Sequence, residues 1–211
     1  MRIIEPSWSF EDHIDPKAIM EKIERAGRTC YKSEGRIGDG TAERFIRGII
    51  SRGHESVLEH ASITVRIICD RGVSHELVRH RIASYSQEST RYCNYNDGKF
   101  GGELTFIKPC YCEEGSALYT AWEDAMYDAE RTYQWMIDHG AKPEEARAVL
   151  PNSLKTEIVV TMNLREWRYF FKLRTAPAAH PQMREISGMM LDGFKEKLPV
   201  LFGDIGGGAD A

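Results

Sequence analysis

Cysteine is scarce in this chain, and the cysteines that occur are poorly spaced for a metal site. The 211 residues include five cysteines, an odd number, and no two of them form a CxxC pair. Cys110 and Cys112 cannot by themselves supply the four ligands of a structural zinc site. The pattern therefore argues against a disulfide framework or a zinc finger, and it indicates a reduced, cytosolic chain.

Long apolar stretches are also missing. No run of about 18 uncharged apolar residues occurs, so the sequence predicts no membrane-spanning helix. The opening residues, MRIIEPSWSF, lack the basic segment and long apolar run of a signal peptide. We therefore expect a cytoplasmic protein. Low-complexity sequence is confined to the glycine-rich end, where residues 206–211 are predicted to be a flexible tail behind one domain over residues 1–205.

Positive charge is not in excess. The chain has 28 Lys and Arg residues against 32 Asp and Glu residues, a net charge of −4. Such a balance gives no global basic field for binding nucleic acid, so any bound anion must be held by a local cluster of cations. Hydrophobic residues make up 42% of the chain, which is ordinary for a soluble domain with a sizeable core.

Hydrophobic periodicity predicts helices and strands in an irregular order. Helices are expected from Pro16 after Asp15, from about Thr41 as N-cap, and over residues 74–81, 116–139, 143–151, 165–173 and 181–198. Alternating residues predict strands over residues 1–4, 61–69, 103–108 and 155–163, with Gly72 breaking the second of these. Because this order has no regular βαβ alternation, we expect an α+β fold: a mostly antiparallel central sheet flanked by helices, in a single domain.

The densest polar cluster lies between residues 79 and 91. This segment, RHRIASYSQESTR, holds three arginines, one histidine and three serines. On a helix, Arg79 and Arg81 would project about 200° apart, and the residue one turn before Arg79 is His75 rather than an acid. Close cations are costly unless an anion lies between them, and arginine forks with serine hydroxyls suit phosphate oxygens. By itself, the segment is either a phosphate site or a solvated basic turn.

The order of residues within this segment is more specific than its composition. Arg-His-Arg, seven residues and then Ser-x-Arg resembles the signature of the flavin-dependent thymidylate synthases. Three further segments resemble that family in the same order along the chain. They are residues 53–60 (GHESVLEH), residues 147–151 (RAVLP), and the pair formed by residues 163–165 (NLR) and 173–174 (LR). The sequence is therefore identified as a member of this family over nearly its whole length.

The resemblance implies an enzyme of dTMP biosynthesis, a methyltransferase that converts dUMP to dTMP. Such an enzyme is a flavoprotein that takes its carbon from 5,10-methylenetetrahydrofolate, uses FAD as hydride carrier and NADPH as reductant, and forms no covalent bond with the uracil. The family resemblance also implies a homotetramer with active sites at subunit interfaces. No metal, nucleic acid or membrane is an expected partner.

The resemblance assigns residues to two ligands. The predicted dUMP ligands are short donors, planar cations and one carboxylate, namely Glu76, Arg79, Gln87, Ser89, Arg91 and Arg147, the last from another subunit. The predicted FAD ligands are His54, Ser56, Arg79, His80, Arg81, Gln87, Asn163, Arg165 and Tyr169. His54 would lie where the folate or the nicotinamide enters.

Arg174 is the key catalytic residue that the resemblance implies. Its guanidinium, a permanent cation, would stabilise negative charge on the uracil as ring nitrogen 3 loses its proton. From position alone, Arg174 could also be a helix C-terminal cation that the macrodipole favours. Ser89 has the look of a nucleophile, but the sequence gives it no general base, and in this family the serine is a ligand.

Some positions depart from the family pattern. Tyr169 stands where many members have His or Asn, and Ser86-Gln87 replaces an Asn-Glu pair. Glu76 stands where Gln is frequent; because a carboxylate cannot donate to a phosphate, the sugar hydroxyl is its expected partner. Asn163 is also a good N-cap for the helix that follows it.

Two other classes of protein are alternatives. A nucleotide hydrolase would need metal-binding carboxylates, yet the acidic pairs at residues 113–114 and 144–145 lie at predicted helix starts, and no P-loop GxxxxGK[ST] occurs. An RNA-binding module would need a basic surface and aromatic residues on its strands, which neither the net charge nor the predicted strands supply. The flavoenzyme accounts for all four segments.

Overall fold

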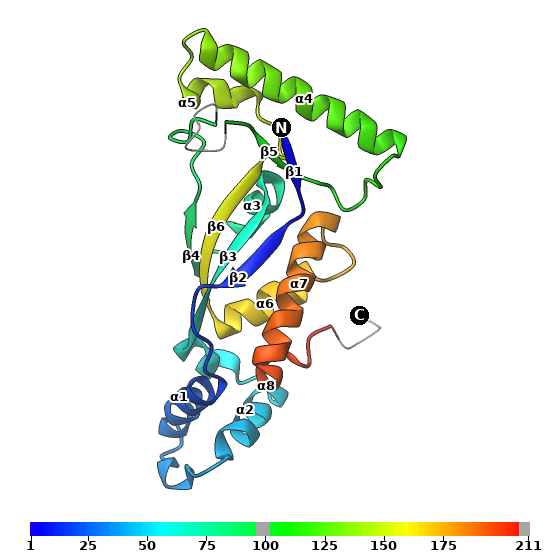
Figure 1. Cartoon of the computed structure of the whole chain (residues 1–211). Coiled ribbons are helices and arrows are strands. Elements are labelled where there is room, and N and C mark those ends of the chain that lie inside the picture. The colour runs from blue at the N-terminus through cyan, green and yellow to red at the C-terminus, as the bar shows by residue number, and fades with distance from the viewer. Residues whose placement is uncertain (96–101, 207–211) are drawn as a thin grey trace. The chain divides into compact units, whose positions relative to one another are not determined.

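The structure, a computed structural model, describes residues 1–95 and 102–206. The helices are α1 (Pro16–Thr29), α2 (Thr41–Ser51), α3 (Arg71–Leu77), α4 (Ala117–Asp138), α5 (Pro143–Ala146), α6 (Leu164–Arg174), α7 (Pro181–Lys197) and α8 (Pro199–Phe202) (Figure 1). The strands are β1 (Arg2–Ile4), β2 (Ser7–Phe10), β3 (Ser62–Asp70), β4 (Ala83–Gln87), β5 (Thr105–Ile107) and β6 (Lys155–Asn163).

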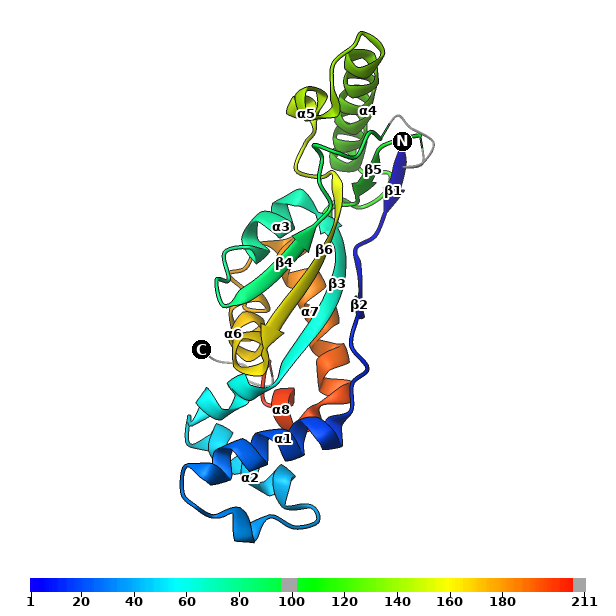
Figure 2. The same ribbon diagram turned by 90° about the vertical axis from the view of Figure 1, so that its left-hand side faces the viewer.

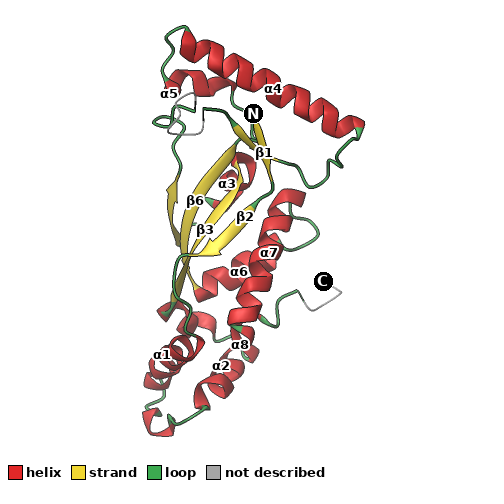
Figure 3. Ribbon diagram, viewed as in Figure 1, coloured by secondary structure: helices red, strands yellow, loops and turns green. Residues whose placement is uncertain are grey.

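The strands form two sheets. Four strands make an antiparallel sheet in the order β2-β3-β6-β4, in which the long strands β3 and β6 are central neighbours (Figure 2). β1 and β5 pair in parallel, with Ile3 opposite Phe106. Helices and strands follow one another without a repeating βαβ unit (Figure 3). The predicted α+β fold with a mostly antiparallel sheet is confirmed.

Contacts between residues divide the chain into two compact units. The first comprises Met1–Trp8, Arg66–Arg79 and Tyr85–Val159, and the second comprises Ser9–Val65, His80–Ser84 and Val160–Ala211. β3 and β6 each contribute residues to both units. The arginine-rich segment does so as well, because Arg79 belongs to the first unit and His80 to the second.

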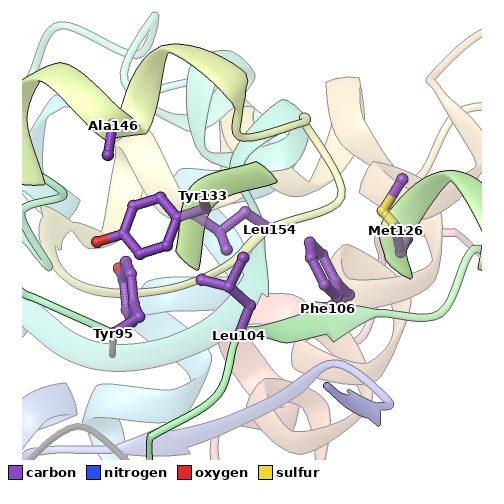
Figure 4. Packing of buried hydrophobic residues seen from close by; sticks show 7 residues of the cluster. All are labelled: Tyr95, Leu104, Phe106, Met126, Tyr133, Ala146 and Leu154. Atoms are coloured by element: carbon purple, nitrogen blue, oxygen red, sulfur yellow. The ribbon is translucent and has the colours of Figure 1, made fainter. Parts of the chain in front are cut away.

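The core of the first unit gathers around α4 and β5. Figure 4 shows the cluster of buried side chains, which consists of Tyr95, Leu104, Phe106, Met126, Tyr133, Ala146 and Leu154. The N-terminal ammonium group of Met1 lies 2.8 Å from the carboxylate of Glu130 on α4. Glu130 also accepts the backbone N–H of Leu104 at 2.9 Å. These contacts tie the segment before β5 and the chain's first residue to α4.

The core of the second unit is aromatic. Trp167 and Phe171 of α6 stack with their ring centroids 5.7 Å apart, and Phe194 of α7 lies 5.0 Å from Phe171. The indole N–H of Trp167 donates to the carbonyl of Ile63 in β3 at 3.0 Å. Each buried aromatic ring contributes about 1.5–3 kcal/mol by leaving water. This packing fixes the orientation of α6, the helix that carries the predicted flavin residues Arg165 and Tyr169 and the catalytic candidate Arg174.

Several predicted elements are confirmed. β6 spans the residues that alternation predicted, with every second side chain buried. α1 begins after Asp15, whose Oδ1 accepts the backbone N–H of Ala18 at 3.0 Å. α4 likewise begins after Ser116, whose side chain accepts the N–H of Tyr119. In each helix the capping side chain satisfies a backbone donor that the first turn leaves without a partner.

The helix predicted over residues 74–81 is present, but its predicted bounds are wrong, because α3 spans Arg71–Leu77. Asp70 caps α3 by accepting the N–H of Val73 at 2.8 Å, so the helix starts earlier and Gly72 lies inside it. The hydroxyl of Tyr85 donates to the carbonyl of Leu77 at 2.7 Å, satisfying an acceptor at the helix C-terminus. The Arg-His-Arg triplet therefore follows the helix, and a helical angle between Arg79 and Arg81 does not apply.

The N-cap predicted at Thr41 is also wrong. Gly40, with φ of 70°, precedes α2, and Thr41 is the first helical residue. The Thr41 hydroxyl instead accepts the N–H of Gly38 at 3.1 Å and lies 2.9 Å from a carboxylate oxygen of Glu24. The sequence reading missed β2, β4 and α8, all of which are short. Of the predicted tail, residues 207–211 lie outside the described residues.

None of the helices described for residues 1–95 and 102–206 combines the length and hydropathy that crossing a bilayer requires.

Candidate active site

Two polar side chains of the second unit form hydrogen bonds with the imidazole of His80. Nδ1 of His80 lies 3.0 Å from Oε1 of Glu166, and Nε of Arg174 donates to Nε2 of His80 at 3.1 Å. Glu166 lies in the first turn of α6, and Arg174 is its last residue. The rings of Phe170 and Tyr169, from the same helix, meet the imidazole edge-on at 5.1 and 5.9 Å. The imidazole is thus bound along one side of α6.

Donor chemistry fixes the protonation of this imidazole. A guanidinium group only donates hydrogen bonds, so Nε2 of His80 must be unprotonated where Arg174 meets it. Nδ1 then carries the proton and donates to Glu166. Burial lowers the pKa of His80 below its usual value; the hydrogen bond with Glu166 opposes this effect and the charge of Arg174 adds to it. His80, which is 4% exposed, is therefore a neutral ring at pH 7.

Local sequence sets both ends of α6. Asn163 caps the helix by accepting the N–H of Glu166 at 2.9 Å, as predicted. Lys172 and Arg174 stand in the last turn, where the helix dipole favours cations. The position of Arg174 thus agrees with the simpler interpretation of a helix C-terminal cation. Its contact with His80 goes beyond that interpretation, because it joins Arg174 to the arginine-rich segment.

A first hollow of the second unit lies beside this network. Its volume is about 410 Å³, and its lining includes three predicted flavin residues, Asn163, Arg165 and Tyr169. The side chain of Arg165 pairs with Glu59 at 2.6 Å across it. Tyr169 is 56% exposed. The structure therefore brings these three predicted residues together on one concave surface, next to Glu166.

A second hollow of the same unit has a volume of about 700 Å³. Its lining includes His54 and Ser56, the two predicted flavin residues within residues 53–60. It also includes four arginines, namely Arg28, Arg36, Arg52 and Arg165. Glu55 and Arg165 line both hollows. The two hollows therefore adjoin; the larger is rich in arginine, and the smaller is lined by three glutamates together with Arg165 and Lys172.

Sequence reasoning missed two residues that shape this surface. Arg168, which is buried, donates to Oε1 of Glu55 at 3.2 Å and so fixes the carboxylate shared by both hollows. Lys172 lies 3.7 Å from the same carboxylate. Glu166 was missed as well. An acid in the first turn of a helix is usual, and His80 lies far away in the sequence, so no local signal marks the contact.

Gln87, in the first unit, is held by two hydrogen bonds. Its Nε2 donates to the hydroxyl of Ser74 at 2.9 Å and to that of Thr156 at 3.1 Å. Both N–H groups of the amide thereby stay within the protein, and the amide oxygen is the atom through which Gln87 could meet a ligand. Gln87 can therefore make its predicted ligand contact only by accepting a hydrogen bond through the amide oxygen.

The predicted phosphate ligands of the first unit lie on neighbouring segments. The hydroxyl of Ser89 accepts the N–H of Arg91 at 3.3 Å, in a tight turn after β4. Arg91 lies 3.8 Å from the carboxylate of Glu144 on α5. Arg147 follows α5 directly and is exposed. The turn at Ser89 and the end of α5 therefore bring two exposed arginines and a hydroxyl to the same part of this unit.

The other predicted residues lie around α3. Glu76 is on the helix and is half-buried, whereas Arg79 and Arg81 follow it and are exposed. Arg79 and Glu76 belong to the first unit and Arg81 to the second. The predicted dUMP ligands thus all lie in the first unit, and the catalytic candidate Arg174 lies in the second.

A third hollow, of about 540 Å³, lies within the first unit and includes Gln87 in its lining. Its charged residues are already paired. Lys155 lies 2.7 Å from Glu88, and Arg66 forms an ion pair with Glu157. Within the described part of the chain, no group of three or more His, Cys, Asp and Glu side chains is arranged to hold a metal ion.

Comparison with known proteins gives consistent matches. The model of the family described as "Thymidylate synthase complementing protein" matches residues 14–200. The "Flavin-dependent thymidylate synthase" of Pyrococcus furiosus is 40% identical over 167 residues, which cover 79% of this chain and 68% of the relative. The protein of the same name from Geobacter sulfurreducens is 38% identical over 201 residues, which cover 92% of this chain and 84% of the relative.

Solved structures share the fold. The crystal structure of "a UMP/dUMP methylase PolB from Streptomyces cacaoi bound with 5-Br dUMP" superposes with a TM-score of 0.78 and covers 96% of each chain. Its sequence is 23% identical to this one. At that identity the likeness concerns the arrangement of helices and strands.

Proposed function

The chain belongs to the thymidylate synthase complementing protein family, whose members are flavin-dependent thymidylate synthases, and we propose that it methylates dUMP to dTMP. In this proposal 5,10-methylenetetrahydrofolate supplies the carbon, FAD carries the hydride and NADPH is the reductant. No covalent bond forms between the enzyme and the uracil. The enzyme acts in the cytoplasm, in dTMP biosynthesis.

The pair of adjoining hollows in the second unit, the larger of them rich in arginine, is the observation that carries the proposal. An FAD molecule is elongated and carries two phosphate charges. The adjoining hollows, of about 410 and 700 Å³, have the size usual for ligand sites, which is about 300–1,000 Å³. Of their four arginines, Arg28 and Arg165 pair with Glu24 and Glu59, and the exposed Arg36 and Arg52 suit a pyrophosphate. Exposed Tyr169, in the smaller hollow, offers a ring and a hydroxyl to a flavin. The residues present therefore fit the cofactor.

The chain's residues divide the work of holding FAD. His54, Ser56, Asn163, Arg165 and Tyr169 would contact it from the two hollows. The exposed Arg79 and Arg81 would contact its phosphates. His80 would act from the interior of the unit, because its ring is enclosed between Glu166, Arg174 and the aromatic residues of α6. When bound, FAD supplies the hydride that reduces the transferred carbon to a methyl group.

Arg174 performs the catalytic step in this proposal. Its guanidinium stabilises the negative charge that develops on the uracil when nitrogen 3 loses its proton, which makes carbon 5 more nucleophilic. As a permanent cation, Arg174 does not itself exchange a proton. Its contact with His80 uses Nε, which orients the plane of the guanidinium without engaging the two Nη atoms in that contact.

The first unit binds the nucleotide. Ser89 and Arg91 hold the dUMP phosphate, and Arg147 reaches it from another subunit of a homotetramer. Arg79 and Gln87 would contact both ligands, with Gln87 accepting through its amide oxygen. Glu76 meets the sugar hydroxyl. Residues 1–205 act as one functional domain.

Two measurements test the proposed function. The purified protein is expected to show the absorption band of an oxidised flavin, or to gain it with added FAD. It is also expected to release tritium from dUMP labelled at carbon 5, in a reaction that needs both NADPH and methylenetetrahydrofolate. A protein that binds no FAD under native conditions would contradict the proposal. Tritium release that continues without folate would contradict the carbon source.

A further inference from the structure

The contact of Glu166 with His80 is the basis of this inference. Glu166 and Arg174, which contact the two nitrogens of the His80 ring, both belong to α6 and stand eight positions apart in the sequence, about 12 Å along a helix axis. Their side chains reach toward each other and meet the ring from its two nitrogens, while Phe170, between them in the sequence, meets the ring edge-on. One carboxylate and one guanidinium of the same helix are therefore linked through a side chain from another part of the fold.

Hydrogen-bond polarity makes this linkage directional. Glu166, as a carboxylate, accepts only, and Arg174 donates only. The imidazole satisfies both if, and only if, its proton is on Nδ1. If the proton moved to Nε2, an N–H would point at the donating Nε of Arg174, and a lone pair would face the carboxylate of Glu166. Glu166 thus selects the tautomer that Arg174 requires.

Burial strengthens this selection. The side chain of His80 is 3% exposed and that of Glu166 is 12% exposed, so water competes little for either nitrogen. A buried N–H that loses its acceptor is costly, and the ring would rotate or shift to recover one. Without Glu166, the Nε2 atom would no longer be held at the position where Arg174 meets it.

We propose that Glu166 is a positioning residue, which holds His80 as the Nδ1–H tautomer so that Nε2 orients the guanidinium of Arg174. The inference rests on the proposed function, in which Arg174 acts on the uracil. Glu166 touches neither substrate nor reacting atoms in this role. Its effect is on turnover, because misplacement of a catalytic group by about 1 Å costs up to about 100-fold in rate.

Two substitutions of Glu166 separate hydrogen bonding from charge. Glu166→Ala removes the acceptor and is expected to lower kcat about 10- to 100-fold, while the KM for dUMP and the FAD content change little. Glu166→Gln offers an amide oxygen to the same N–H and is expected to keep kcat within about threefold of the wild type. The exposed carboxylate of Glu196 in α7 provides the control variant Glu196→Ala. Equal losses in the two Glu166 variants, or loss of FAD in step with kcat, would overturn the inference.

A substitution of His80 tests whether Glu166 acts through it. In His80→Ala no ring is left for Glu166 to hold or for Arg174 to donate to. Adding Glu166→Ala to His80→Ala is therefore expected to change kcat less than about twofold, far less than in the wild type. A full loss in both backgrounds would show that Glu166 acts by another route.

A spectroscopic readout separates this inference from the proposed function. In protein labelled with ¹⁵N-histidine, the His80 ring signals, identified by their absence in His80→Gln, are expected to report a proton on Nδ1 in the wild type. A proton on Nε2 in an active enzyme would overturn the positioning role alone. Absence of tritium release from the wild type would overturn the proposed function and, with it, the claim that Glu166 affects turnover. The observed tautomer would still decide whether Glu166 holds the proton of His80 on Nδ1.

Discussion

The buried guanidinium of Arg168 holds the carboxylate of Asp204 with two parallel hydrogen bonds of 2.7 Å each. The same guanidinium donates to the carbonyl of Leu201 and to Glu55. Glu55 lines both hollows of the second unit, so one side chain connects their shared carboxylate to the segment after α8. Removal of either acid would leave an incompletely paired charge inside the unit.

Asp204→Asn is expected to destabilise the protein by about 1–3 kcal/mol, because it breaks the bidentate pair and leaves the buried Arg168 with fewer acceptors. Asp204 itself is half-exposed, which keeps the cost at this level. Urea unfolding at pH 7 measures the change. Asp128→Asn, at an exposed ion pair on α4, is the control and is expected to shift the free energy of unfolding by less than about 0.5 kcal/mol.

This pair also makes a prediction about pH. The hydrogen bonds from Arg168 lower the pKa of Asp204 below its ordinary value. A lowered folded-state pKa means that the pair stabilises the protein above the unfolded pKa of about 4, and that this contribution is lost as pH falls through the folded pKa. The difference in unfolding free energy between wild type and Asp204→Asn is therefore expected to shrink below pH 4. A constant difference down to pH 2 would contradict this account.

Arg174→Ala is expected to lower kcat by about 100- to 1,000-fold, as removal of a donor that stabilises developing charge usually does. FAD binding should change much less, since the two hollows keep their other residues. Rates of tritium release, measured beside flavin absorbance, separate the two effects. Arg131→Ala, at an exposed position of α4, is the control. A variant that loses FAD and activity in parallel would show that Arg174 is only structural.

The sequence predicted what depends on neighbouring residues and missed what depends on distant ones. Period-two alternation placed β6 correctly, and Asn163 caps α6 as its chemistry suggested. The helix predicted over residues 74–81 is present as α3, but it ends at Leu77, whose carbonyl accepts from the hydroxyl of Tyr85, eight residues further along the chain. No periodicity could show that Glu166 meets His80, since that contact exists only after α6 packs in the second unit.

The protonation of His80 predicts a pH dependence of turnover. Burial lowers the pKa of His80, so the ring stays neutral down to a pH below its ordinary value of about 6.5. Once protonated, Nε2 carries an N–H and no longer accepts from Arg174. Glu166, Arg174 and Tyr169 are among the charged and polar groups that face the ring.

We therefore expect wild-type kcat to fall on the acid side with a midpoint below pH 6.5, a fall that His80→Gln lacks. Because the unfolded chain binds this proton more readily, folding stability also decreases as pH falls below about 6.5. Flavin absorbance at each pH checks that FAD is retained. An acid fall that persists unchanged in His80→Gln would assign it to another group.

Ser89→Ala is expected to raise the KM for dUMP about 10-fold or more, which corresponds to the loss of one hydrogen bond to a charged phosphate, and to leave kcat measurable. The hydroxyl of Ser89 accepts the backbone N–H of Arg91, a group that cannot take its proton, so the geometry suits a ligand and not a nucleophile. Ser7→Ala, at an exposed position of β2, is the control. Complete loss of turnover with dUMP still bound would instead require a covalent role for Ser89. A variant in which only the KM for dUMP rises would agree with a serine that binds the phosphate while Arg174 acts on the uracil ring.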